Sequence, residues 1–152
     1  MKLPPFQDLL DSDGPAVHGY LVALLGPDDG ADCFQDTMVA ALGSYPGLRD
    51  ASNLRSWLFT IAHHRAVDRF RSEGRSVTVA DLPERVAAPV DADPELWKAV
   101  AKLSPKQRAA VVMRYLADMP YADIGEIVGC SEAAARQNVR AALANLREVL
   151  DR

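Results

Sequence analysis

The C-terminal segment, residues 116–152, has the pattern of two short helices joined by a tight turn. Pro120 begins the first helix, Ile124 lies on its apolar side, and Gly129 ends it before Ser131 caps the next helix. This order is typical of a helix-turn-helix unit, whose second helix conventionally lies in the major groove of DNA. No other segment carries chemistry of comparable specificity, so the rest of the chain must show what this unit is attached to.

Apolar residues recur at helical spacing through the first half of the chain, without the alternation that is typical of strands. A first helical zone stops at Gly26, and a second begins near residues 29–32 and is broken by the glycines and proline of residues 43–47. A third and longer zone runs from about residue 53 to residue 72. We therefore predict a small helical bundle in residues 1–75.

Residues 76–93 have no sustained helical period and mix prolines with small and charged residues. This composition is typical of a linker. Beyond it, residues 94–152 again have helical spacing throughout. The predicted fold class is all-α, with two small helical domains joined by a flexible acidic linker.

The C-terminal domain is expected to hold two helices before the helix-turn-helix pair. The first is short and amphipathic and lies within residues 96–103. Ser104 is then placed to cap the second helix, with Pro105 at its first position and Gln107 placed to complete a capping box. Four helices in some sixty residues are enough to enclose a small core.

The charge of the chain is uneven along its length. The formal net charge is −4, which by itself counts against a nucleic-acid partner. However, residues 54–75 hold five arginines against two acidic residues, a net +3, while residues 76–93 hold one arginine against four acidic residues, a net −3. The basic segment is therefore a candidate for contact with phosphates, separated from the helix-turn-helix by an acidic stretch.

Cysteine usage and hydropathy exclude several classes of protein. Cys33 and Cys130 lie far apart with no CxxC spacing, which argues against a zinc site or a disulfide framework, and we expect both to be small buried residues. No apolar stretch approaches the roughly 20 residues of a membrane helix, and no signal peptide is evident. We expect a cytoplasmic protein with no membrane insertion, no metal and no cofactor.

The last helix carries two distinct faces on a helical projection. An apolar stripe of Val139, Leu143, Leu146 and Leu150 would face the core. Beside it, Arg136, Arg140 and Arg147 form one band, with Gln137 and Ala133 further round. Arginine and glutamine suit bidentate contacts to base edges. A solvated helix face is the competing interpretation, and Arg147 has the further alternative of complementing the helix dipole; the turn and cap upstream favour DNA reading.

The segment from Asn53 to Arg71 interleaves aromatic residues with arginines. Such a pattern suits single-stranded nucleic acid, because bases stack on rings and phosphates meet cations. Core packing remains the first interpretation for Trp57 and Phe70. Contact with DNA is the first interpretation for His63, His64 and Arg65.

Three motifs, taken in order, resemble a known family. They are Asp32-Cys33-Phe34-Gln35-Asp36-Thr37, the segment 54–71, and Tyr121-Ala122-Asp123-Ile124-Gly125-Glu126-Ile127-Val128-Gly129. Together they look like a bacterial RNA polymerase sigma factor of the extracytoplasmic-function group. The resemblance implies that residues 1–75 form a region-2-like domain that binds core RNA polymerase and opens the minus-ten element. Residues 94–152 would form a region-4-like domain that reads the minus-thirty-five element of promoter DNA.

The resemblance also implies roles for individual residues. The side chains expected to meet the polymerase are Asp32, Gln35 and Asp36. Those expected at the downstream element are Asn53, Arg55, Trp57, His63, His64, Arg65 and Arg69, and those expected at the upstream element are Ser131, Glu132, Ala133, Arg136, Gln137 and Arg140. An anti-sigma protein is a further partner that the resemblance allows.

The chain departs from the family pattern at several positions. His63-His64 stands where relatives often have Arg-Asn, and Ala134, Ala135 and Ala141 stand where several basic residues are common. Because counterion release scales with the number of phosphates neutralised, we expect weak binding to free DNA. The competing hypotheses are a DNA-binding regulator that works without polymerase and a degenerate sigma-like interaction protein. An enzyme is least favoured, since no catalytic residue set is recognisable.

Overall fold

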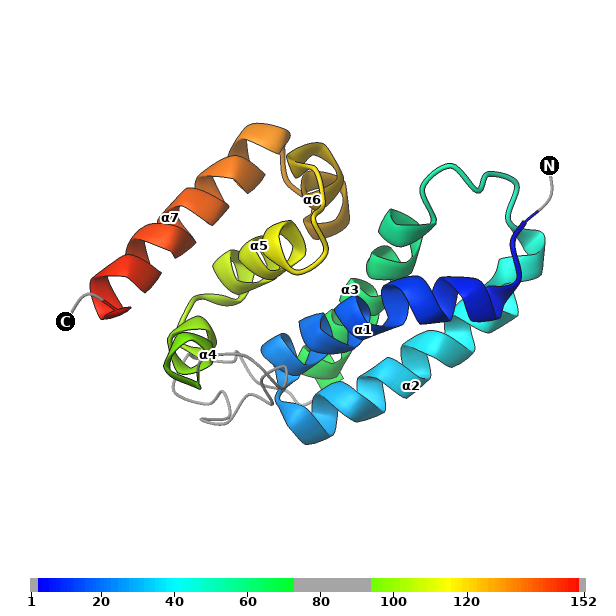
Figure 1. Cartoon of the computed structure of the whole chain (residues 1–152), viewed down its shortest axis with the longest axis horizontal. Helices are drawn as coiled ribbons and strands as arrows, with labels where there is room; N and C mark the ends of the chain where they lie inside the picture. Colours follow the sequence, from blue (N-terminus) through cyan, green and yellow to red (C-terminus); the bar gives the residue numbers. More distant parts are fainter. Residues whose placement is uncertain (1–2, 73–93, 151–152) are drawn as a thin grey trace.

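The computed structural model describes residues 3–72 and 94–150, and within them every regular element is helical, as predicted. The helices are α1 (Phe6–Leu25), α2 (Pro27–Ser44), the 3-10 turn η1 (Tyr45–Gly47), α3 (Leu54–Ser72), α4 (Pro94–Ala101), α5 (Pro105–Tyr115), α6 (Tyr121–Val128) and α7 (Glu132–Leu150). Figure 1 shows α1, α2 and α3 as one group and α4 to α7 as another. The predicted linker lies outside the described residues.

The first group is built on an antiparallel pair, α1 and α2, across which α3 packs (Figure 1). Gly26 joins the pair with a φ of 92°, and Pro27 opens α2 at a position where a missing amide costs nothing. Helix α2 therefore starts two residues before the predicted site and continues through Gly43 to Ser44. The core of this first group of helices is formed by large side chains that are fully buried, among them Tyr20, Leu21, Leu58 and Phe59.

The second group confirms most of the local signals in the sequence. The Ser104 hydroxyl accepts from the Gln107 amide at 3.3 Å. The Gln107 side chain, however, accepts from Asn145 Nδ2 at 3.2 Å and so ties α5 to α7 in place of the expected return bond to the cap. Gly129 has φ 81° in the left-handed region, and Ser131 Oγ accepts from the Ala134 amide at 3.0 Å, which confirms both ends of the predicted turn.

Burial corrects one prediction about the cysteines. Cys33 is fully buried, as expected, but Cys130 is only partly buried in the turn between α6 and α7, because the turn lies at the surface. On α7, Val139 and Leu146 are buried and Leu143 is half-buried, which confirms the core stripe as far as Leu146. The side chains of Phe70 and Leu150 lie outside the described part. None of the described helices is long and apolar enough to cross a membrane.

The two groups of helices pack against each other. The predicted flexible linker gave no indication of this contact. Helix α1 contacts α4 and α5, and α3 contacts α6. At the centre of this contact Arg108 of α5 is 1 % exposed. Its guanidinium donates to the carbonyls of Ala23 and Leu24 at the end of α1, at 3.2 and 3.3 Å. The same group donates to the carbonyls of Ala101 and Leu103, at 2.8 and 2.9 Å.

Candidate nucleic-acid interface

Helix α7 presents the side chains that the sequence assigns to the upstream element. Six exposed residues form this set, with Ser131 just before the helix and the others on its first half: Ser131, Glu132, Ala133, Arg136, Gln137 and Arg140. The Arg136 guanidinium pairs with Glu132 Oε1 at 3.3 Å, one helical turn earlier. Because the partners sit four residues apart on one helix, the pair aligns Arg136 along the exposed face without tying it to another element.

Tyr121, the first residue of α6, supports this arginine from the neighbouring helix. Arg136 lies over the Tyr121 ring at 4.9 Å, and Arg114 of α5 lies over the same ring at 4.4 Å. Arg114 also donates to the carbonyl of Met119, which leads into α6. Cation–π contact of this kind restricts a long side chain while leaving its outer edge free to donate. Sequence reasoning named Tyr121 only as part of the family motif and missed Arg114, because the contact joins three helices.

The angle between α6 and α7 depends on a close backbone contact. A Cβ atom on Gly125 would lie 2.6 Å from the carbonyl oxygen of Cys130 and 3.1 Å from that of Ser131. The Gly125 carbonyl itself accepts from the amides of both Gly129 and Cys130. The turn therefore folds back onto α6 directly, which positions the start of α7 and its exposed arginines.

The residues that the sequence assigns to the downstream element lie in environments that differ more from one another than those on α7. The first of them is Asn53, at the start of α3. Its Oδ1 accepts from the Ser56 amide at 3.3 Å, so the side chain caps the helix. Its Nδ2 donates to Asp123 Oδ2 of α6 at 3.1 Å, across the contact between the two helical groups.

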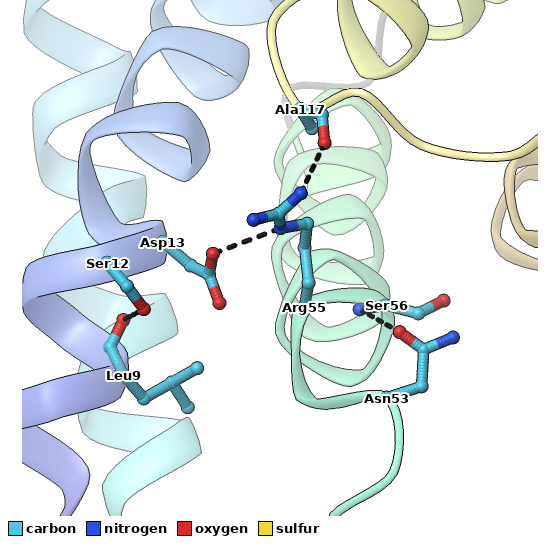
Figure 2. Close-up of polar contacts among 7 residues, drawn as sticks. All are labelled: Leu9, Ser12, Asp13, Asn53, Arg55, Ser56 and Ala117. Carbon is cyan, nitrogen blue, oxygen red and sulfur yellow. Dashed lines mark hydrogen bonds and ion pairs between the residues drawn. The ribbon is translucent and has the colours of Figure 1, made fainter.

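Arg55 also bridges the two groups, as Figure 2 shows. Its Nε pairs with Asp13 Oδ1 of α1 at 3.0 Å, and its Nη1 donates to the carbonyl of Ala117, after α5, at 2.9 Å. Asp13 is a buried carboxylate, 6 % exposed, so Arg55 supplies the charge that its burial requires. An arginine that the sequence assigns to DNA is here bound within the protein.

His63 lies further along α3 and is half-buried. The Tyr20 hydroxyl and His63 Nδ1 lie 2.8 Å apart, and burial, with a smaller effect of the neighbouring His64, lowers the pKa of His63 to about 4. The imidazole is therefore neutral at pH 7. His64 and Arg65 are exposed, and both histidines line a cleft of about 690 Å³ between α3 and helices α5 and α6.

Trp57 and Arg69 have protein partners of their own. The Trp57 ring is partly buried against the core, 6.0 Å from the Tyr45 ring, in agreement with core packing as its first interpretation. Arg69 pairs with Asp36 at 3.3 Å and with Asp29 at 3.6 Å, both on α2. The structure thus brings Arg69 to the acidic helix and away from Asn53 and Arg55.

Helix α2 presents the three residues that the sequence assigns to polymerase. Asp32, Gln35 and Asp36 are all exposed on it. Further along, Val39 and Leu42 are 73 % and 55 % exposed, large apolar side chains to which sequence reasoning gave no functional role. Their position on the helix relative to buried Thr37 and Ala41 is the signal that could have found them, since an amphipathic helix places its core on one side.

Comparison with known proteins agrees with these two groups of helices. The model of Sigma-70 region 2 matches residues 9–76, and that of Sigma-70 region 4 matches residues 94–146. RNA polymerase sigma factor CarQ of Myxococcus xanthus is 31% identical, over 95% of this chain and 88% of that protein. RNA polymerase sigma factor YlaC of Bacillus subtilis is 28% identical, over 77% of this chain and 75% of its own length.

Two solved structures resemble the whole arrangement. The sigma factor RpoE of Bartonella quintana, in complex with the anti-sigma factor NepR, has a TM-score of 0.84 and 26% identity over 98% of both chains. CnrH, in complex with the cytosolic domain of CnrY, has a TM-score of 0.70 and 26% identity, over 96% of this chain and 87% of its own. The chain belongs to the RNA polymerase sigma factors of the extracytoplasmic-function group and is a promoter-directing transcription initiation factor.

Proposed function

We propose that residues 1–75 bind core RNA polymerase and hold the melted minus-ten element, while residues 94–152 read the minus-thirty-five element. The observation that carries the second assignment is the exposed face of α7. There Arg136 is aligned by Glu132 and by the Tyr121 ring, and Gln137 and Arg140 stand beside it, all exposed. Side chains of this kind read base edges in the major groove.

For the first assignment, the exposed face of α2 is the proposed polymerase contact. Asp32 and Asp36 give it a negative charge that repels DNA, Gln35 adds a polar amide, and Val39 and Leu42 add an apolar patch. Central apolar area with a polar surround is typical of protein interfaces. The downstream strand would then meet Asn53, Arg55, Trp57, His63, His64, Arg65 and Arg69 on or beside α3. No bond is made or broken by the chain itself in this role.

An anti-sigma protein is proposed as a further partner. The support is that the sigma factor RpoE, a solved relative described above, is in complex with the anti-sigma factor NepR. An apolar groove of about 400 Å³ between α4, α5 and α7, lined by Trp97, Tyr115 and Leu116 among others, offers surface for a partner helix.

Transcription with purified components tests the proposal. The protein is mixed with core RNA polymerase and a library of promoter fragments, and start sites are mapped. Transcripts that require both protein and core polymerase support the sigma role. Tight sequence-specific binding to DNA without polymerase, together with no transcripts, would instead support the regulator hypothesis.

A further inference from the structure

We propose that Tyr45 is a positioning residue for the loop of residues 48–53, and that the start of α1 and the residues just before it hold Tyr45 in place. The loop ends at Asn53 and leads to Trp57, two of the side chains proposed for the downstream element. The inference rests on the proposed function and deepens it, because it concerns how the same downstream site is kept in shape. Tyr45 itself touches no nucleic acid in this role.

Tyr45 joins three segments that lie far apart in the chain. Its side chain is 6 % exposed, and its hydroxyl donates to the carbonyl of Pro4, 41 residues earlier. The ring of Phe6, the first residue of α1, meets the Tyr45 ring edge to face, with centroids 5.3 Å apart. The Tyr45 ring in turn lies 6.0 Å from the ring of Trp57 on α3. We call this set, Pro4, Phe6, Tyr45 and Trp57, the aromatic clamp.

The segment before α1 is well suited to present the carbonyl that Tyr45 requires. Pro4 and Pro5 are stiff, because each ring fixes its own φ and a residue before a proline is held extended. The Pro5 carbonyl accepts from the Asp8 amide at 3.0 Å and so starts the helix. The Pro4 carbonyl lies one residue outside the helix and is left for the buried phenol, which needs a partner. Figure 1 shows this segment beside the end of α2, where η1 begins.

Backbone and polar contacts carry the position of Tyr45 into the loop. The Leu48 amide donates to the Tyr45 carbonyl at 3.1 Å and closes η1. Within the loop, Asp50 Oδ1 accepts from the Ser52 amide at 2.9 Å. Asn53 then caps α3 and fixes the far end. Because the loop is short and bonded at both ends, a displacement of Tyr45 displaces the exposed residues between them.

The shape of the loop before DNA arrives affects the affinity for the melted strand. A strand that meets a loop already in its binding shape does not have to order it, so less conformational entropy is lost on binding. When only a fraction of the molecules has that shape, the apparent affinity falls by the same fraction. Tyr45 is buried, whereas Arg49, Asp50, Ser52 and Asn53 are exposed. The clamp therefore holds the loop from within the protein and leaves its outer side available to the strand.

Two substitutions weaken the clamp in different ways. Tyr45→Phe removes the hydroxyl and keeps the ring, and Phe6→Leu removes a ring and keeps an apolar side chain. The control is Val17→Ala, at a fully buried position of α1 outside the clamp. Its truncation should destabilise the same group of helices at least as much as Tyr45→Phe does. Chemical unfolding verifies that each variant is folded under the assay conditions.

The fluorescence of Trp57 measures the order of the clamp in the protein alone. The chain holds two tryptophans, so every protein in this experiment carries Trp97→Phe and Trp57 is the only tryptophan that emits. Tyr45→Phe and Phe6→Leu should each raise the acrylamide quenching constant of Trp57 by about twofold, because local opening exposes its partly buried ring. The control should match the wild type, since its cavity lies elsewhere.

Binding of the melted strand is measured with the complex of the full chain and core RNA polymerase. The probe is the non-template strand of a promoter recovered in the transcription experiment above, compared with the same strand carrying a scrambled minus-ten element. Both clamp variants should bind the first strand about three- to tenfold more weakly, and the scrambled strand with much less change. Binding of core polymerase, measured by pull-down, should stay at the wild-type value in all variants, and the control should bind both strands as the wild type does.

Each outcome decides for or against the clamp. Higher quenching together with weaker and less selective strand binding supports it. Unchanged quenching in both variants overturns it, and so does higher quenching with unchanged strand binding. An equal loss of strand binding in Val17→Ala also overturns it, because stability alone would then explain the effect. Failure to recover any promoter with the wild type is a separate failure of the proposed function, and quenching then still decides whether Tyr45 holds the loop.

Discussion

The Tyr20 hydroxyl lies 2.8 Å from Nδ1 of His63, although the two residues are 43 positions apart in the chain. Tyr20 is fully buried, and burial raises the pKa of its hydroxyl far above the usual range, so the group keeps its proton. The contact is satisfied when that hydroxyl donates to an unprotonated Nδ1. Protonation of the imidazole removes this acceptor and places a charge at a half-buried position.

Stability should therefore fall as the pH is lowered below 6.5. Burial lowers the pKa of His63 to about 4 in the folded state, so between pH 6.5 and 4 the unfolded chain binds more protons than the folded one. The His63 contribution is fully present above pH 6.5 and is lost toward pH 4, by about 2 kcal/mol. Urea unfolding between pH 7.5 and 4.5 measures it.

His63→Gln and His64→Gln provide the comparison. His63→Gln should reduce the loss of unfolding free energy between pH 7.5 and 4.5 by about 2 kcal/mol. His64→Gln, at an exposed position, should leave most of that loss in place. An unchanged slope in His63→Gln would assign the acid lability to other groups.

Arg108 should be a major contributor to stability. Its guanidinium satisfies four backbone carbonyls from α1, α4 and the turn before α5, while burial lowers its pKa only to about 10, so it stays charged. Arg108→Met leaves these acceptors without the donor and should cost about 2–4 kcal/mol. The matched change Lys106→Met, on the same helix but exposed, should lie within about 0.5 kcal/mol of the wild type. Equal stabilities of the two variants, measured by chemical unfolding, would contradict this role.

Substitution of the two glycines of the helix-turn-helix, Gly125 and Gly129, should destabilise the protein by different amounts. Gly125→Ala forces a Cβ against backbone oxygens and should cost about 2–3 kcal/mol. Gly129→Ala meets no neighbour but must adopt φ 81°, at a cost of about 1 kcal/mol. Thermal unfolding ranks the stabilities of the variants. Gly43→Ala is the control and should cause no loss of stability. The ranking is refuted if Gly129→Ala proves the more damaging change.

Recognition of the upstream promoter element should depend on the N-terminal half of α7. Arg136→Ala and Arg140→Ala should each reduce transcription from promoters that need the upstream element by about tenfold, because a lost base contact costs about 1–3 kcal/mol. Core polymerase binding, measured by pull-down, should remain intact. Arg147→Ala, on the same helix nearer its C-terminal end, is the control and should have a smaller effect. Loss of polymerase binding in the Arg136 or Arg140 variant would show that the proposed division of roles is wrong.

The local architecture could be predicted from the sequence because its causes lie within a few residues. Ser104, Ser131 and Gly129 mark helix ends through their own hydrogen bonds and backbone angles. The periodicity of Val139 and Leu146 sets the buried side of α7 in the same way. The motifs also identified the family, since they depend on order along the chain and not on contacts.

Only the tertiary structure decided how the two domains meet and what the site residues contact. Nothing near Arg108 in the sequence indicates that it reaches Ala23 and Leu24, 85 and 84 residues away. Arg55 is an ordinary basic residue of a basic segment until the fold places Asp13 and Ala117 beside it. Caps and helical periods are local and can be read along the chain, whereas the partners of a long polar side chain depend on which helices pack together.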